Sequence, residues 1–135
     1  ALSETSLKDA KLAMRKQNDI NGERAGIAPK FLIVPPDLEV TAQKLLASIN
    51  ATKTSDVNPH TDLELVVESR FASTTLWYLC ADPANVRGIE YAFLDGAEGG
   101  QIEVRTGWEV DGIEIRSILD LGVAFIDARG WVAGG

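Results

Sequence analysis

The sequence has few of the residues that usually carry chemistry. Its 135 residues include one cysteine, Cys80, and one histidine, His60. A single cysteine excludes an internal disulfide, and one histidine with one cysteine is too few for a zinc site. No apolar run approaches the roughly 18 residues that a membrane-spanning helix needs. We therefore predict no metal-ligating residues and no membrane partner.

Basic residues are also scarce. Thirteen lysines and arginines stand against 20 aspartates and glutamates, which gives a formal net charge of −7. A protein that neutralises many phosphates needs clustered basic residues, and here they are scattered. We expect no tight binding of nucleic acid, and we interpret the acidity as favouring solubility. The hydrophobic content of 45% is ordinary for a globular protein, and the length points to one domain or to one compact body with a small appendage.

Signatures of catalysis are missing as well. No Gly-x-Ser-x-Gly motif occurs, and the glycine-rich residues 96–100 lack the lysine and the residue order of a phosphate-binding loop. His60 lies in a polar loop where no neighbour in sequence orients it, and Cys80 ends an apolar strand that should bury it. Asp120 and Asp127 are the available carboxylate pair, but a strand and a turn separate them. We predict no catalytic or cofactor-binding residue and no enzymatic activity.

Two helices are predicted. The first covers residues 6–17, with Ser6 and Asp9 as a capping box, and needs a partner surface because its apolar stripe is narrow. The second covers residues 37–48, directly after two prolines. Its expected apolar face consists of Leu38, Ala42, Leu45, Leu46 and Ile49. A polar loop is predicted at 50–62, and it is long for a connection within a compact domain, so it is either mobile or functional.

Several strands are predicted from apolar runs and alternation. They cover residues 31–34, 63–68, 74–80, 89–94 and 118–125. After a turn, Trp131 and Val132 close the chain before a Gly134-Gly135 tail. The aromatic pair Trp77 and Tyr78 is expected in the core. Together with the helices, these strands indicate an α+β fold with a mixed or antiparallel sheet.

A long β-hairpin is the clearest local pattern. Apolar and polar residues alternate over 102–110 and again over 113–117, around an Asp111-Gly112 turn. A two-residue turn would pair Val110 with Ile113, Trp108 with Ile115, and Thr106 with Ser117. It would also place Glu109 opposite Glu114, and Glu103 opposite Asp120. This acidic face is either simply solvated or meets an external basic surface.

Five segments have a characteristic order. They are Phe31-Leu32-Ile33-Val34-Pro35-Pro36, then Leu76-Trp77-Tyr78-Leu79 with Asp82-Pro83, Ile89-Glu90-Tyr91 with Leu94-Asp95-Gly96, Gly107-Trp108-Glu109-Val110-Asp111-Gly112, and Asp120-Leu121-Gly122 with Asp127-Ala128-Arg129-Gly130. In this order and spacing they resemble the C-terminal half of Mu-like phage and prophage major head subunits. The resemblance implies an HK97-type capsid fold, of which residues 1–135 would form the C-terminal part.

The resemblance also implies a division of the chain and a set of partners. Residues 25–98 with 118–135 would form a body like the axial domain, and residues 1–20 with 101–117 would be remnants of the peripheral domain. The full-length protein would form homo-oligomeric capsomers in an icosahedral shell that encloses DNA. The location would be the virion, after synthesis in the cytoplasm of a bacterial host.

Two other classes of function stay open on the sequence. One is a small ligand-binding or scaffolding domain of a phage or bacterial complex. The other is a hydrolase that uses carboxylates in a cleft. A deep pocket with converging carboxylates would favour the hydrolase.

Overall fold

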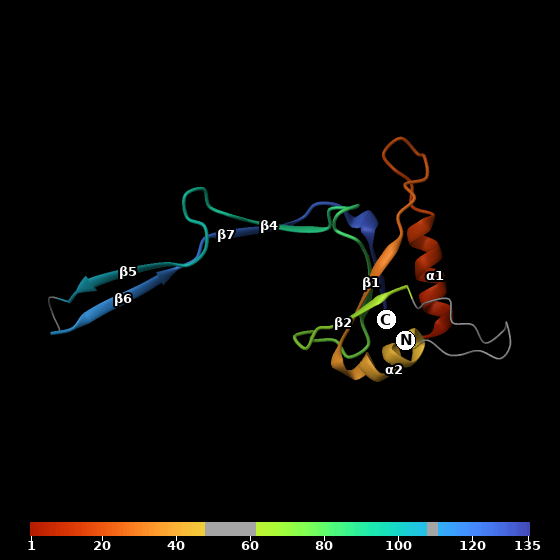
Figure 1. The fold of residues 1–135 in the computed structure, drawn as a ribbon, viewed down its shortest axis with the longest axis horizontal. Helices are drawn as coiled ribbons and strands as arrows, with labels where there is room; N and C mark the ends of the chain where they lie inside the picture. Colours follow the sequence, from red (N-terminus) through yellow and green to blue (C-terminus); the bar gives the residue numbers. More distant parts are fainter. Residues whose placement is uncertain (48–61, 108–110) are drawn as a thin grey trace. The chain divides into compact units, whose positions relative to one another are not determined.

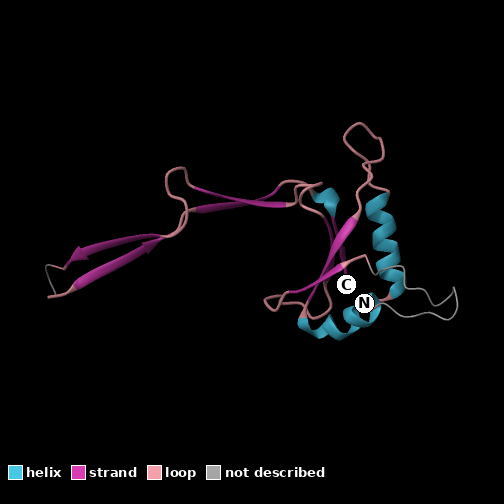
Figure 2. Ribbon diagram, viewed as in Figure 1, coloured by secondary structure: helices cyan, strands magenta, loops and turns pink. Residues whose placement is uncertain are grey.

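The chain has an α+β fold, as the sequence predicts. The computed structural model describes residues 1–47, 62–107 and 111–135. Contacts divide the chain into two compact units. We call residues 1–88 with 127–135 the body unit, and residues 89–126 the ribbon unit. Both described helices belong to the body unit, and the described part of the ribbon unit contains strands and loops (Figure 2).

A four-stranded mixed sheet forms the centre of the body unit. Its strands, in spatial order, are β2 (Glu64–Val67), β1 (Pro29–Val34), β3 (Trp77–Ala81) and β8 (Trp131–Gly134). β1 runs parallel to β2 and antiparallel to β3, and β3 runs antiparallel to β8. In this register Leu32 lies beside both Leu65 and Leu79. Strands β1, β2 and β3 were predicted from apolar runs and alternation, whereas β8 was not, because its segment Trp131–Gly134 is short and ends in glycine.

Helix α1 (Glu4–Arg15) packs against β8 (Figure 1). Its predicted apolar stripe is confirmed, because Leu7, Ala10 and Met14 are buried. The predicted capping box is wrong: Ser3 is the N-cap and pairs with Ser6, so the helix begins two residues earlier than expected. The Ser3 hydroxyl can satisfy an unpaired backbone N–H of the first turn, which makes this cap favourable.

The second predicted helix is present but divided. A 3-10 helix, η1 (Pro36–Leu38), leads into α2 (Glu39–Leu46), which packs against β2. Ala42 is buried, and the predicted apolar neighbours Leu38, Leu45 and Leu46 are partly buried against the core. Ile49 and the loop predicted at 50–62 lie outside the described residues, except for Asp62. Neither of the two described helices is long and apolar enough to cross a membrane.

The core of the body unit lies between the sheet and helix α1. Its largest fully buried side chains are Trp77, Leu7, Met14, Leu32, Leu79, Val34 and Pro35. The predicted burial of Trp77 is confirmed, while Tyr78 is half-buried and packs edge-to-face against Phe71 and Trp131. The two termini lie together (Figure 1), with the amino group of Ala1 donating to the carbonyl of Gly135 at 2.6 Å.

The ribbon unit consists of two antiparallel two-stranded ribbons. One pairs β4 (Ile89–Phe93) with β7 (Leu121–Phe125), and the other pairs β5 (Gln101–Thr106) with β6 (Ile113–Ile118). The strand predicted at 118–125 is present but shorter, because β7 begins at Leu121 and Ile118 is the last residue of β6. Leu119 and Asp120 lie between β6 and β7, which pair with different strands.

The hairpin is confirmed, but its predicted register is wrong. Thr106 pairs with Ile113 instead of Ser117, a shift of four residues. The backbone N–H of Gly107 donates to the carbonyl of Gly112 at 3.0 Å and closes a wider turn than the predicted Asp111-Gly112 turn. The predicted pairs that involve Trp108, Glu109 and Val110 fall partly outside the described residues. The shift has an even number of residues, so the predicted apolar side of the strands is unchanged.

Candidate assembly surface

The ribbon of β4 and β7 has one side made of large apolar residues. Ile89, Tyr91 and Phe93 on β4 lie opposite Phe125, Val123 and Leu121 on β7. We call Ile89, Tyr91, Phe93, Leu121 and Val123 the apolar face. Every member is exposed, with Tyr91 70% and Val123 63% accessible, and the rings of Tyr91 and Phe93 pack edge-to-face at 5.7 Å. The opposite side carries smaller or polar residues such as Ala92 and Ala124.

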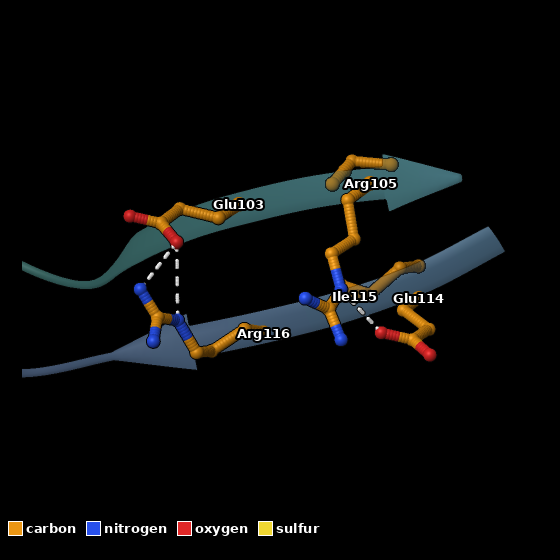
Figure 3. Close-up of a pocket in the computed structure, with 6 residues that line it drawn as sticks. Glu103, Arg105, Glu114, Ile115 and Arg116 are labelled. Carbon is orange, nitrogen blue, oxygen red and sulfur yellow. Dashed lines mark hydrogen bonds and ion pairs between the residues drawn. The ribbon is translucent and has the colours of Figure 1, made fainter. Parts of the chain in front are cut away.

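The ribbon of β5 and β6 has the same two-sided character. Its apolar side presents Ile102, Val104, Ile113 and Ile115, all exposed. On its polar side two cross-strand ion pairs form (Figure 3), from Arg116 to Glu103 at 2.5 Å and from Arg105 to Glu114 at 2.5 Å. The predicted opposition of like charges is therefore wrong, because each glutamate faces an arginine. Opposite charges directly across a ribbon are favourable, and this helps to set the register.

Such ribbons are poorly suited to stand alone in water. A single two-stranded ribbon is only marginally stable, because it has no second layer to cover its apolar side. Burying one large apolar side chain completely contributes about 1.5–3 kcal/mol. A contiguous exposed patch of such side chains on a soluble protein marks a surface for interaction with another molecule. The ribbon unit is therefore the best candidate for an assembly surface.

An open hollow of about 640 Å³ lies along the second ribbon. Its lining residues are Glu103, Val104, Arg105, Glu114, Ile115 and Arg116 (Figure 3). All six are exposed, and a two-stranded ribbon supplies no walls that could enclose a small molecule. Its two glutamates are paired with arginines instead of converging on a common point. A hollow of this kind lacks the enclosure of small-molecule sites.

The residues singled out in the sequence are not gathered into one site. His60 lies outside the described residues. Cys80 is buried as predicted, and burial raises the pKa of its thiol to about 12, which keeps it protonated at neutral pH. Asp120 belongs to the ribbon unit and Asp127 to the body unit. The Arg129 guanidinium and backbone N–H donate to Asp127 and lower the pKa of its carboxyl to about 2.

The described part of the chain contains no group of three or more His, Cys, Asp or Glu side chains placed to hold a metal ion. In the glycine-rich residues 96–100, Gly96 and Gly99 adopt positive φ angles of 76° and 87°. These glycines are needed for the turns that follow β4, since other residues rarely adopt this conformation.

Sequence reasoning missed the apolar face and the charge of the unit that carries it. The alternation of Ile89, Tyr91 and Phe93 can be seen in the sequence, but the pairing of β4 with β7 cannot. Counting the charges separately for each segment of the sequence would have shown that the acidity is concentrated in this unit. Residues 89–126 contain eight acidic residues and two arginines, a net charge of −6, which leaves −1 of the total −7 for the other residues.

The comparison with protein families bears on this surface directly. A model of the phage capsid protein family matches residues 1–134. No curated protein and no solved structure matches the chain. The match covers nearly the whole chain and confirms the resemblance at the level of phage capsid proteins. The chain therefore belongs to the phage capsid protein family.

Proposed function

We propose that the chain is a structural building unit of an icosahedral phage head with an HK97-type fold, related to the head subunits of Mu-like phages and prophages. The observation that carries the proposal is the exposed apolar face of the ribbon unit in a chain of the phage capsid family. A shell protein buries such faces against its neighbours. The ordered motifs at residues 31–36, 76–83 and 107–112 support the finer assignment to the Mu-like group.

The protein would act by assembly instead of catalysis. Two carboxylates of the body unit are held in ion pairs, Asp82 with Lys30 at 2.6 Å and Asp127 with Arg129 at 2.6 Å. A carboxylate held by a cation is a poor general base, because its pKa is lowered. In the assembled head we assign residues 25–98 with 118–135 to the axial-like body and residues 1–20 with 101–117 to the peripheral region.

The shell would enclose DNA without binding it tightly. The net charge of −7 disfavours contact with phosphates, so packaged DNA could move against the inner surface. The protein would be made in the cytoplasm of the bacterial host, form homo-oligomeric capsomers there and end in the virion. A location in the virion is supported by the family to which the chain belongs.

The proposal is tested by expressing the gene product that contains this sequence and imaging it by electron microscopy. Val123→Glu places a charge on the apolar face, whereas Ala124→Glu places the same charge on the other side of the same strand. We expect closed particles from the parent protein and from Ala124→Glu, and none from Val123→Glu. Absence of closed particles from the parent, or closed particles from Val123→Glu, would contradict the proposal.

A further inference from the structure

The ribbon unit combines its apolar face with local acidity. Asp95 and Glu98 follow β4, and Asp120 precedes β7, so all three lie at the same end of the ribbon as Phe93 and Leu121. The backbone N–H of Leu94 donates to the carbonyl of Asp120 at 3.2 Å and holds these two loops together. A surface that covers this end should therefore offer both apolar contact and positive charge.

In the body unit, the outer side of helix α1 has that character. Lys8, Leu12 and Arg15 are spaced four and three residues apart and form a stripe away from the buried Leu7 and Met14. Leu12 is 46% exposed at the centre of this stripe. Lys8 and Arg15 are exposed and make no ion pair within the described parts of the chain. We call Lys8, Leu12 and Arg15 the helix stripe.

Four other cations of the body unit are already engaged in ion pairs. Lys11 pairs with Asp62 at 2.8 Å, Lys30 with Asp82 at 2.6 Å, Arg70 with Glu68 at 2.8 Å, and Arg129 with Asp127 at 2.6 Å. Breaking such a pair to form a new one gains little, whereas Lys8 and Arg15 lose only water. The helix stripe is therefore the better electrostatic partner for the ribbon.

The two surfaces also agree in length. The five residues of β4 span about 13 Å at the usual strand rise. Lys8 to Arg15 spans about 10 Å along the helix axis. Leu12 can then contact the apolar face while a cation at one end of the stripe approaches Asp95, Glu98 or Asp120. One helix placed across a ribbon would cover the apolar side that a two-stranded structure leaves exposed.

We propose that the apolar face of one copy docks on the helix stripe of a second copy, with Arg15 facing the acidic end of the ribbon. This contact deepens the proposed function, on which it rests, by naming two surfaces that join neighbouring subunits. The ribbon and stripe are different surfaces, so the contact is head-to-tail and extends into rings or larger assemblies.

The test is sedimentation of the full chain at low salt with charge-reversed variants. Arg15→Glu and Glu98→Lys should each weaken self-association by about tenfold, because each leaves like charges facing across the contact. Lys44→Glu is the matched control for Arg15→Glu. It makes the same change in net charge at an exposed lysine of α2 and should leave association within about twofold. Raising the salt from about 0.05 M to about 0.5 M should weaken the parent by screening.

A mixture of the two variants separates contact between copies from contact within one chain. Mixed in equal amounts, Arg15→Glu and Glu98→Lys chains regain one unaltered contact and should associate nearly as strongly as the parent. No gain on mixing, or equal effects of Arg15→Glu and Lys44→Glu, would overturn the docking proposal. If the docking proposal fails in this way but the parent gene product still forms closed particles, the proposed function as a shell protein is not contradicted. A full chain that shows no self-association at low salt would also overturn the docking proposal.

Discussion

Glu103 on β5 lies directly opposite Arg116 on β6, and Nη2 of the arginine is 2.5 Å from Oε2 of the glutamate. A second pair, Arg105 with Glu114, follows two residues along the ribbon. The tight turn predicted at Asp111-Gly112 would have placed Glu103 opposite Asp120 instead. The observed register exchanges a short turn for two favourable cross-strand pairs.

The register can be tested by reversing one charge. Glu103→Arg places two arginines opposite each other and should destabilise the ribbon by about 0.2–1 kcal/mol. A double variant that carries both Glu103→Arg and Arg116→Glu should restore the stability of the ribbon, because the two charges then face each other again with their positions exchanged. Hydrogen exchange at the amides of Val104 and Ile115 measures the effect. Glu23→Arg, the same change in an exposed loop of the body unit, is the control. Cross-strand NOEs between Thr106 and Ser117 in place of Thr106 and Ile113 would contradict the observed register.

The sequence predicts the sides of these strands but not their alignment. Alternation places Ile102 and Val104 with Ile113 and Ile115 on one side, and this is confirmed. Alignment depends on the balance between turn geometry and cross-strand pairs, and local sequence favoured the Asp-Gly turn. Shifts by an even number of residues leave the hydrophobic pattern unchanged, so the pattern cannot choose between them.

Helix α1 offers a matched pair of substitutions for the body unit. Met14 is fully buried, while Leu12 on the same helix is 46% exposed. Met14→Ala leaves a cavity and should lower the free energy of unfolding by about 2–5 kcal/mol. Leu12→Ala should change it by less than about 1 kcal/mol, since it removes surface contact only. Urea denaturation followed by tryptophan fluorescence gives both values. Equal losses would show that α1 does not pack as described.

Gly134 on β8 lies against the indole ring of Trp77. A Cβ atom at Gly134 would collide with Cζ2 and Cε2 of this ring, which is almost fully buried and has no room to move away. Gly134→Ala should therefore destabilise the body unit by about 1–3 kcal/mol. Thermal unfolding, followed by the near-ultraviolet circular dichroism of the tryptophans, measures the loss.

Gly122 provides the control for this substitution. It is also a strand glycine, on β7, but open space surrounds the position that its Cβ would take. Gly122→Ala should shift stability by no more than about 0.5 kcal/mol. A Gly134→Ala protein as stable as Gly122→Ala would show that the chain end moves away from Trp77 without loss.

The candidate site was harder to predict than the fold. Buried strands such as β1 and β3 follow from continuous apolar runs, and Cys80 is buried because it belongs to one. The apolar face depends on β4 pairing with β7, whose residues lie about 30 positions apart in the chain. The apolar face is exposed because no second layer in the described chain covers it, and hydrophobic periodicity in the sequence cannot predict whether such a layer is present. The sequence therefore predicts the strand at 89–94 but not that all five residues of β4 are exposed.

The acid sensitivity of the body unit should depend on Asp127. The side chain and backbone N–H of Arg129 donate to its carboxylate and lower its pKa from 3.8 to about 2. Because the pKa is lower in the folded state, this pair stabilises the fold above about pH 4. That stabilisation is lost as the pH falls from about 4 to about 2. Residue-resolved NMR titration of the side-chain carboxyl groups should place the Asp127 midpoint near 2.

Arg129→Gln tests the cause of this shift. It removes the guanidinium donors but leaves the backbone N–H that Asp127 also accepts, so the pKa of Asp127 should rise part of the way toward 3.8. Glu68 serves as the internal control, because Arg70 lowers its pKa to about 2 through a separate pair. Glu68 should titrate unchanged in the variant, whereas the acid unfolding midpoint should move to higher pH. An Asp127 midpoint near 3.8 in the parent protein would contradict the pairing, since the guanidinium would then not hold the carboxylate in solution.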